Sequence, residues 1–184
     1  MGQIRKEGIT LDKFGENLSV FAVNRDDVKD FVKGLPEKCA INPVTLEYEL
    51  QILKIISVGW ALSFYMPESD PDKKPLTHIF WNHIRGISKN ISDLTNLTTG
   101  NKIDYFEILK TRLDTYVKAL SDNRDADTGA ASIIGLTFAE KCNCSDNAIA
   151  VLNGAKMFTI TIGSVKEYLN AVDIEKNQEV KNEN

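Results

Sequence analysis

The chain has 184 residues, with 26 acidic and 22 basic side chains and a net charge of −4, which is typical of one soluble globular domain. Acids are interspersed among the bases, so the clustered positive charge that non-specific nucleic-acid binding requires is absent. Three cysteines argue against a disulfide framework, and the first residues contain no apolar signal-peptide segment. We therefore expect a cytoplasmic protein with no nucleic-acid partner, folded as one helical domain over residues 1–172.

The N-terminal residues 1–23 show no clear helical period, and we interpret them as a possible extended arm or short strand on the core. Asn24 then has the properties of a helix N-cap, because Asp26 and Asp27 follow in the first turn, where the helix dipole favours acids. Gly34 predicts the end of this short helix.

The most distinctive segment is a helix predicted to begin at Asn42 and Pro43, a capping side chain followed by proline at the first helical position. Its first half is amphipathic, with an exposed polar stripe that includes Glu47 and Lys54. Residues 55–66 then carry no charge, and a helix that is apolar all round must be surrounded. This segment is shorter than the roughly 20 residues needed to cross a bilayer. It therefore predicts a central buried helix in an all-α bundle of five to seven helices, with no membrane span.

A second long helix is predicted to begin near Pro75, after a proline-rich loop over residues 67–75. Its apolar residues alternate steps of four and three, the spacing of a coiled-coil seam. The residues of this seam are Phe80, Ile84, Ile87, Ile91 and Leu94. Because the run is short and contains Gly86, it indicates a contact between helices of a bundle and not a free coiled coil.

Two further helices follow in the sequence. Asp104 and Glu107 resemble a capping box at the start of the first of them. The second is predicted from Asp127 to Lys141, and the small residues around Gly135 predict close packing against a neighbouring helix.

The last apolar segment is predicted to begin at Ser145 and to divide near Asn153 and Gly154. Phe158–Ile162 could form a β-strand, since its residues alternate and are partly β-branched. The helical spacing on both sides favours a helix there. Residues 173–184 are charged and rich in amides, which predicts a disordered tail.

No catalytic motif is present: GxSxG, the Walker loop, GxGxxG and HExxH are all absent. His78 and His83 would lie about 140° apart on a helix, so one metal ion is not readily held by both. Di-iron bundles need an acid three residues before a histidine, and Pro75 and Phe80 occupy those positions. We expect no metal or cofactor, and idle thiols at the three cysteines.

One group of side chains has the composition of a binding pocket. Aromatic and polar residues end one long helix and open the next, and an antiparallel pair would bring them together. The group comprises Trp60, Phe64, Tyr65, His78, Trp81, His83 and Arg85. Such side chains line small-molecule pockets, but they also fill ordinary cores and protein–protein hot spots. The group is a candidate site for an apolar small molecule, with core packing as the simpler interpretation.

Taken together, these patterns predict a non-enzymatic intracellular protein that works by association, with itself or with another protein. The seam over residues 80–94 and the small residues around Gly135 support this prediction. A small-molecule-binding helical domain that uses the aromatic group is one alternative. An enzyme in which His83 acts as a base beside Glu49 or Asp104 is another.

Overall fold

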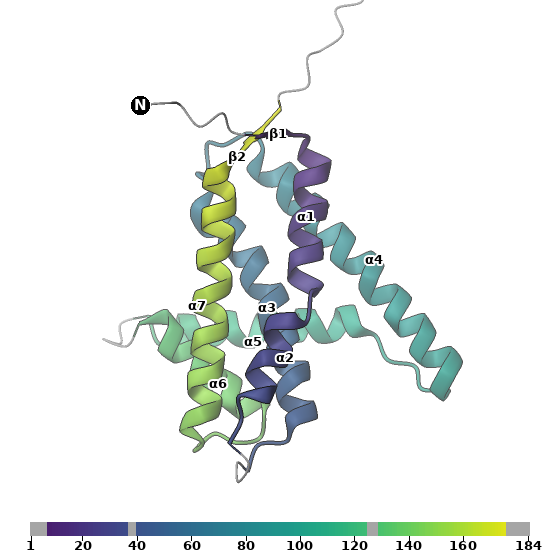
Figure 1. The fold of residues 1–184 in the computed structure, drawn as a ribbon, viewed down its shortest axis with the longest axis vertical. Helices are drawn as coiled ribbons and strands as arrows, with labels where there is room; N and C mark the ends of the chain where they lie inside the picture. Colours follow the sequence, from purple (N-terminus) through teal and green to yellow (C-terminus); the bar gives the residue numbers. More distant parts are fainter. Residues whose placement is uncertain (1–6, 37–39, 125–128, 176–184) are drawn as a thin grey trace, which may run out of the picture.

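The structure, a computed structural model, describes residues 7–36, 40–124 and 129–175. Within these ranges seven helices pack into one bundle (Figure 1). The helices are α1 (Leu11–Val23), α2 (Asp26–Lys33), α3 (Pro43–Tyr65), α4 (Lys73–Thr99), α5 (Tyr105–Asp122), α6 (Ala130–Lys141) and α7 (Ala148–Ala171). Two short strands, β1 (Glu7–Ile9) and β2 (Val172–Ile174), pair in parallel. The prediction of an all-α bundle of five to seven helices is confirmed.

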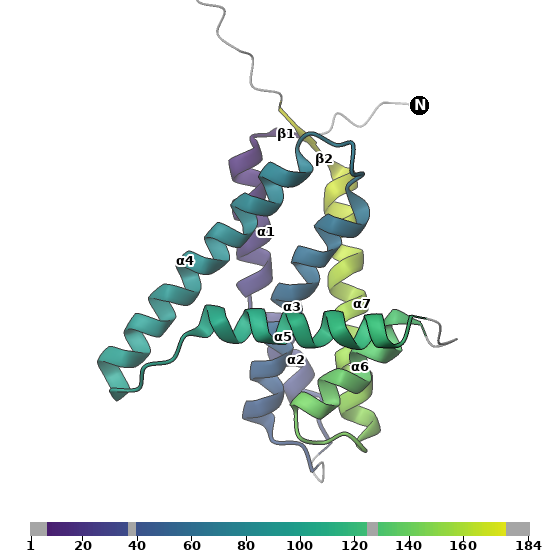
Figure 2. The same ribbon diagram turned by 180° about the vertical axis from the view of Figure 1, so that it is seen from behind.

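Helix α3 is the centre of the bundle, and all six other helices contact it (Figures 1 and 2). It begins where the sequence predicts, since the Asn42 side chain accepts hydrogen bonds from the N–H groups of Val44 and Thr45. Thirteen of its residues between Leu46 and Leu62 are buried. Each large aliphatic side chain among them contributes about 1.5–3 kcal/mol of burial free energy. The predicted central buried helix is confirmed.

Two expectations for α3 are wrong in detail. The charge-free segment is not covered to its end, because Phe64 is 61% exposed and Tyr65 is 38% exposed. The predicted exposed stripe also fails at Lys54, whose side chain is 1% exposed. Its Nζ donates to the Asp27 carboxylate at 2.8 Å and to the Asn24 carbonyl at 2.9 Å. This buried ammonium ties the start of α2 to the centre of the bundle.

The N-terminal segment is also different from the prediction. Residues 11–23 form α1, so an extended arm or strand there is wrong; the three residues of β1 precede it. Phe14, Leu18 and Ala22 lie four residues apart and form one buried stripe. The exposed Val20 between them obscures this period in the sequence.

Helix α7 runs without a break from Ala148 to Ala171, so it is not divided at Asn153 and Gly154. Phe158–Ile162 lies inside it, which confirms the helix over the strand. The side chain of Asn147 caps it instead of Ser145.

Beyond α7, residues 173 and 174 belong to β2, so the predicted disordered tail begins too early. Residues 176–184 of the predicted tail lie outside the described ranges, as does the predicted start of α6 at Asp127.

Helix α4 leaves the bundle as it proceeds. Figures 1 and 2 show its C-terminal half extending beyond α1 and α3, with α5 crossing at an angle. It begins at Lys73 and ends at Thr99, and Gly100, whose φ is 72°, provides a left-handed C-cap. Phe80 and Ile84 are buried in the bundle, but Leu94 is 62% exposed. The second half of the predicted seam therefore lies outside the core.

Candidate functional site

The two tryptophans of the predicted aromatic group pack on different helices. The ring of Trp81 lies against Gly59, where an added Cβ atom would be 2.5 Å from the indole. Trp60 makes edge-to-face contacts with Tyr116 and Phe158, at centroid distances of 6.3 and 6.0 Å. Both rings thus serve helix packing, Trp81 between α3 and α4 and Trp60 between α3, α5 and α7.

The other members of the group lie near the surface. Phe64 and Tyr65 are exposed at the end of α3, and the Lys166 ammonium lies 5.2 Å from the Tyr65 ring centroid. His78 and His83 are both exposed on α4. The structure does not gather the predicted group around one cavity.

The carboxylates considered as partners of His83 are engaged elsewhere. Glu49 accepts three hydrogen bonds from Arg112, at 2.7, 2.9 and 3.3 Å. Asp104 caps α5 by accepting from the N–H of Glu107 at 3.0 Å, as the capping pattern predicts. The geometry therefore does not provide the acid–base pair of the enzyme alternative.

The Glu49–Arg112 ion pair lies inside the bundle, with the carboxylate side chain 3% exposed. The hydrogen bonds that Arg112 donates to the Glu49 carboxylate raise the pKa of Arg112. Burial raises the pKa of Tyr116 and of the Cys142 thiol, so both stay neutral beside the pair. The Tyr116 hydroxyl has no hydrogen-bond partner among the described residues. This polar cluster joins α3 to α5; the Glu49 carboxylate is buried, whereas the Arg112 side chain is 24% exposed.

Cysteine and histidine do not form a metal site in the described part of the chain, where no three potential ligands converge. Cys142 is buried at the C-cap of α6, and Cys144 is partly buried in the following turn. Cys39 lies outside the described ranges.

The small residues around Gly135 are occupied within the molecule. A Cβ atom added to Gly135 would lie 2.4 Å from the carbonyl oxygen of Val151 and 3.1 Å from Ala155 Cβ. The predicted close packing is therefore confirmed, and it joins α6 to α7. This face is not available to a partner.

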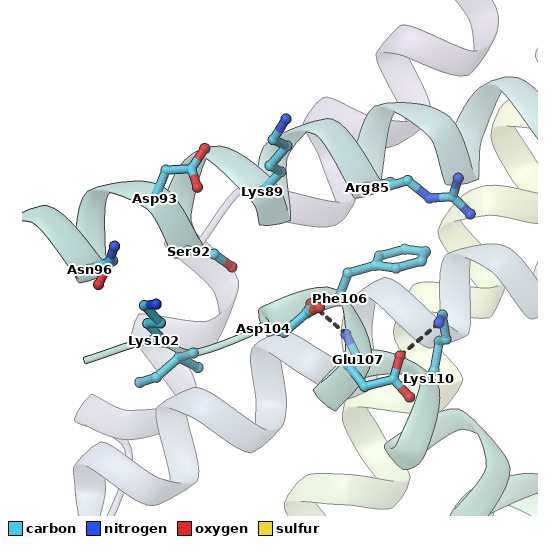
Figure 3. Close-up of a pocket in the computed structure, with 11 residues that line it drawn as sticks. Arg85, Lys89, Ser92, Asp93, Asn96, Lys102, Asp104, Phe106, Glu107 and Lys110 are labelled. Atoms are coloured by element: carbon cyan, nitrogen blue, oxygen red, sulfur yellow. Dashed lines mark hydrogen bonds and ion pairs between the residues drawn. The ribbon is translucent and has the colours of Figure 1, made fainter. Parts of the chain in front are cut away.

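A polar pocket of about 540 Å³ lies between α4 and the start of α5 (Figure 3). The guanidinium of Arg85 lies 5.0 Å from the ring centroid of Phe106. Glu107 pairs with Lys110 at 2.7 Å, and Lys102 adds another positive charge to the lining. Because acids and bases both line this pocket, its charge does not select one sign of ligand.

An apolar groove lies on the other side of the α4–α5 contact, where α4 diverges from α3. Its volume is about 360 Å³. The lining is mostly aliphatic and aromatic and comprises Val23, Arg25, Val44, Glu47, Tyr48, Gln51, Ile52, Ile55, Ile84, Ile87, Ser88, Ile91, Tyr105 and Leu109. Its two charged residues neutralise each other, since Arg25 and Glu47 pair at 2.6 Å. We call this set the α3–α4 groove.

The α3–α4 groove continues into an exposed apolar stripe on α4. Ile91 is 46% exposed and Leu94 is 62% exposed, and both share a helix face with Ile87. By the helix pitch of about 100° per residue, Lys89 and Asp93 lie on the opposite side. Figure 3 shows these two charged side chains projecting from α4 away from α5. We call Ile87, Ile91 and Leu94, with the neighbouring Leu97, the α4 stripe.

Helix α7 also carries apolar surface. By length and composition it could cross a membrane, and one third of its most apolar window is buried. Such helices are also found in the cores of soluble proteins, and here α6 and α3 pack on α7. Its exposed Leu152 lies between the half-buried Val151 and Asn153, outside the α3–α4 groove.

The sequence predicts the apolar seam on α4 but not the α3–α4 groove beside it. The α3–α4 groove combines residues from positions 23 to 109, and only the tertiary arrangement brings them together. Comparison of the chain with protein-family models, curated proteins and solved structures finds no match.

Proposed function

We propose that this protein works by non-enzymatic association, and that the α3–α4 groove with the α4 stripe is the surface that binds. The proposal rests on the apolar seam of α4, of which only the first half is buried. Phe80 and Ile84 are fully packed, whereas Ile91 and Leu94 repeat the same spacing without cover. Contiguous exposed apolar surface of this kind marks interaction sites in soluble proteins.

The shape of the surface favours a helix as the bound element. A groove between diverging helices accepts an amphipathic helix, whose anchors recur at three- and four-residue steps. Ile87 and Leu94 are seven residues apart, about 10 Å along α4, which corresponds to two turns of a bound helix. The neutral Arg25–Glu47 pair at the rim leaves the groove without net charge.

Site-specific photo-crosslinking tests this proposal. A photoreactive phenylalanine analogue replaces Leu94 or, as a matched control, Leu152, which is 64% exposed on α7. In the cells that make the protein, we expect covalent adducts from position 94 and few from position 152. The adduct should disappear when Ile91→Glu is added, because a carboxylate on the α4 stripe cannot be buried without cost. Equal labelling from both positions, or adducts that survive Ile91→Glu, would contradict the proposal.

An apolar small molecule in the same groove is the second candidate. The groove volume of about 360 Å³ lies within the range of ligand pockets. Native mass spectrometry of protein purified from its own cells separates the two candidates. A retained mass of a few hundred daltons that is lost with Ile55→Glu would favour the small molecule.

A further inference from the structure

We infer that the helix bound in the α3–α4 groove is α4 of a second copy of this chain, so that two α4 helices cross antiparallel in a symmetric dimer. This inference rests on the proposed function and adds the identity of the partner. The surface contains both a groove and an exposed ridge on the same helix. A two-fold axis places each ridge into the groove of the other copy, as an isologous interface requires.

The spacing of the α4 stripe supports this pairing. Side chains at alternating steps of three and four interlock with a helix that carries the same spacing. Helix α4 itself meets that condition through Ile84, Ile87, Ile91 and Leu94. With a two-fold axis level with Lys89 along α4, Ile87 of one copy lies opposite Ile91 of the other. Leu94 of one copy then lies opposite Ile84 of the other, which lines the groove.

The charge distribution favours a second copy at this surface. The chain carries a net charge of −4, so two copies repel each other wherever acidic faces meet. On α4, the side chains of Ile87, Ile91 and Leu94 are flanked by the uncharged Asn90 and Thr98, with Lys89 and Asp93 on the far side of the helix. The groove opposite is also neutral. Two acidic molecules can meet here without placing like charges against each other.

The size of the surface predicts a weak dimer. The groove has 14 lining residues, to which Leu94 and Leu97 add two more. Stable interfaces use roughly 20–30 residues on each side, so this one lies at the transient end of the range. We therefore expect a weak association, with monomer in dilute solution and dimer at high concentration.

Sedimentation velocity of the full chain over a range of concentrations tests the inference. The wild type should pass from monomer to dimer, and Leu94→Glu should raise the dissociation constant at least about 30-fold. The matched control Leu152→Glu changes an equally exposed leucine, 64% against 62%, and should dimerise as the wild type does. Circular dichroism verifies that both variants are folded, and Leu97→Glu, at an 82% exposed position, provides a second disrupting variant.

The antiparallel arrangement of the two α4 helices is tested separately by NMR. In a mixture of isotope-labelled and unlabelled protein at high concentration, filtered NMR should show contacts between the Ile87 methyls of one copy and the Ile91 methyls of the other. A monomer at every concentration would overturn the inference, as would dimers that persist in both Leu94→Glu and Leu97→Glu. If a monomer still gives crosslinks to another protein from position 94, the second copy is refuted and the proposed function stands. A protein that stays monomeric and gives no crosslinks from position 94 would refute both the dimer and the proposed function.

Discussion

Glu49 and Arg112 show how a single buried pair can decide the cost of a substitution. The Glu49 carboxylate is 3% exposed and is neutralised by one guanidinium. Arg112→Met leaves that carboxylate buried without a cation, and we expect the free energy of unfolding to fall by about 3 kcal/mol. Chemical denaturation at pH 7 measures the change.

The double variant Glu49→Leu with Arg112→Met removes both charges and should recover most of the lost stability. As a control, Lys118→Met breaks the exposed ion pair of Lys118 with Asp122 and should leave stability unchanged. An equally small effect at Arg112 would show that the buried pair is not needed to neutralise Glu49.

The Tyr116 hydroxyl contributes a buried group with no hydrogen-bond partner among the described residues. Tyr116→Phe removes this hydroxyl, and we expect the stability at pH 7 to stay the same or rise by about 1 kcal/mol. A fall of similar size would mean that the hydroxyl is satisfied in solution.

The same substitution changes the response to alkaline pH. Burial raises the pKa of Tyr116 in the folded state above its ordinary value of 10.0. The unfolded chain therefore loses its tyrosine proton above pH 10 while the folded chain keeps it, and stability falls as pH rises. Each pH unit above 10 costs about 1.4 kcal/mol for one such group. Urea titrations at pH 9 and 11 should show a shallower fall for Tyr116→Phe than for the wild type.

At the scale of elements, the contact between α6 and α7 depends on glycine. Gly135→Ala would place a Cβ atom 2.4 Å from the Val151 carbonyl oxygen, and backbone cannot move aside cheaply. We expect a loss of about 2 kcal/mol in the free energy of unfolding. Gly163 in α7 is the matched control, because an added Cβ meets nothing within 4 Å.

Gly163→Ala should stabilise the protein by about 0.5–1 kcal/mol, since alanine loses less backbone entropy in a helix. Thermal unfolding of the two variants should therefore shift in opposite directions. A shift in the same direction would contradict the close packing of α6 on α7.

The elements that could be predicted from sequence are those with local signals. Asn42 and Pro43 mark the start of α3, and the charge-free residues that follow predict its burial. The partners of buried charges could not be predicted, because they are distant in sequence. Lys54 was expected in water, but Asp27 on α2 provides its counter-ion. Arg112, from α5, likewise lies 63 positions from Glu49.

The candidate site could be predicted only in part. The spacing from Phe80 to Leu94 identifies an apolar face of α4, but spacing alone does not say which neighbour covers each turn. The core takes Phe80 and Ile84, and the divergence of α4 leaves Leu94 in solvent. The predicted aromatic group does not come together around one cavity, because Trp60 and Trp81 pack against different helices.

At the scale of the whole molecule, the fold combines a closed core with a helix, α4, whose second half leaves the bundle. The centre of α3 is surrounded by six helices, whereas the second half of α4 has support mainly from the start of α5. Regions with few buried contacts open at low free energy, so α4 beyond Ile91 should be the least protected long helix segment in the monomer. The proposed dimer would supply the missing cover.

Hydrogen exchange measured by mass spectrometry at low and high protein concentration tests this account most directly. We expect slow exchange in α3 at both concentrations, and fast exchange over residues 89–99 in dilute solution. On concentration, protection should rise over α4 residues 84–97 and over the groove residues of α3, with no change in α7 around Leu152. Exchange over α4 that is independent of concentration would contradict self-association through this surface.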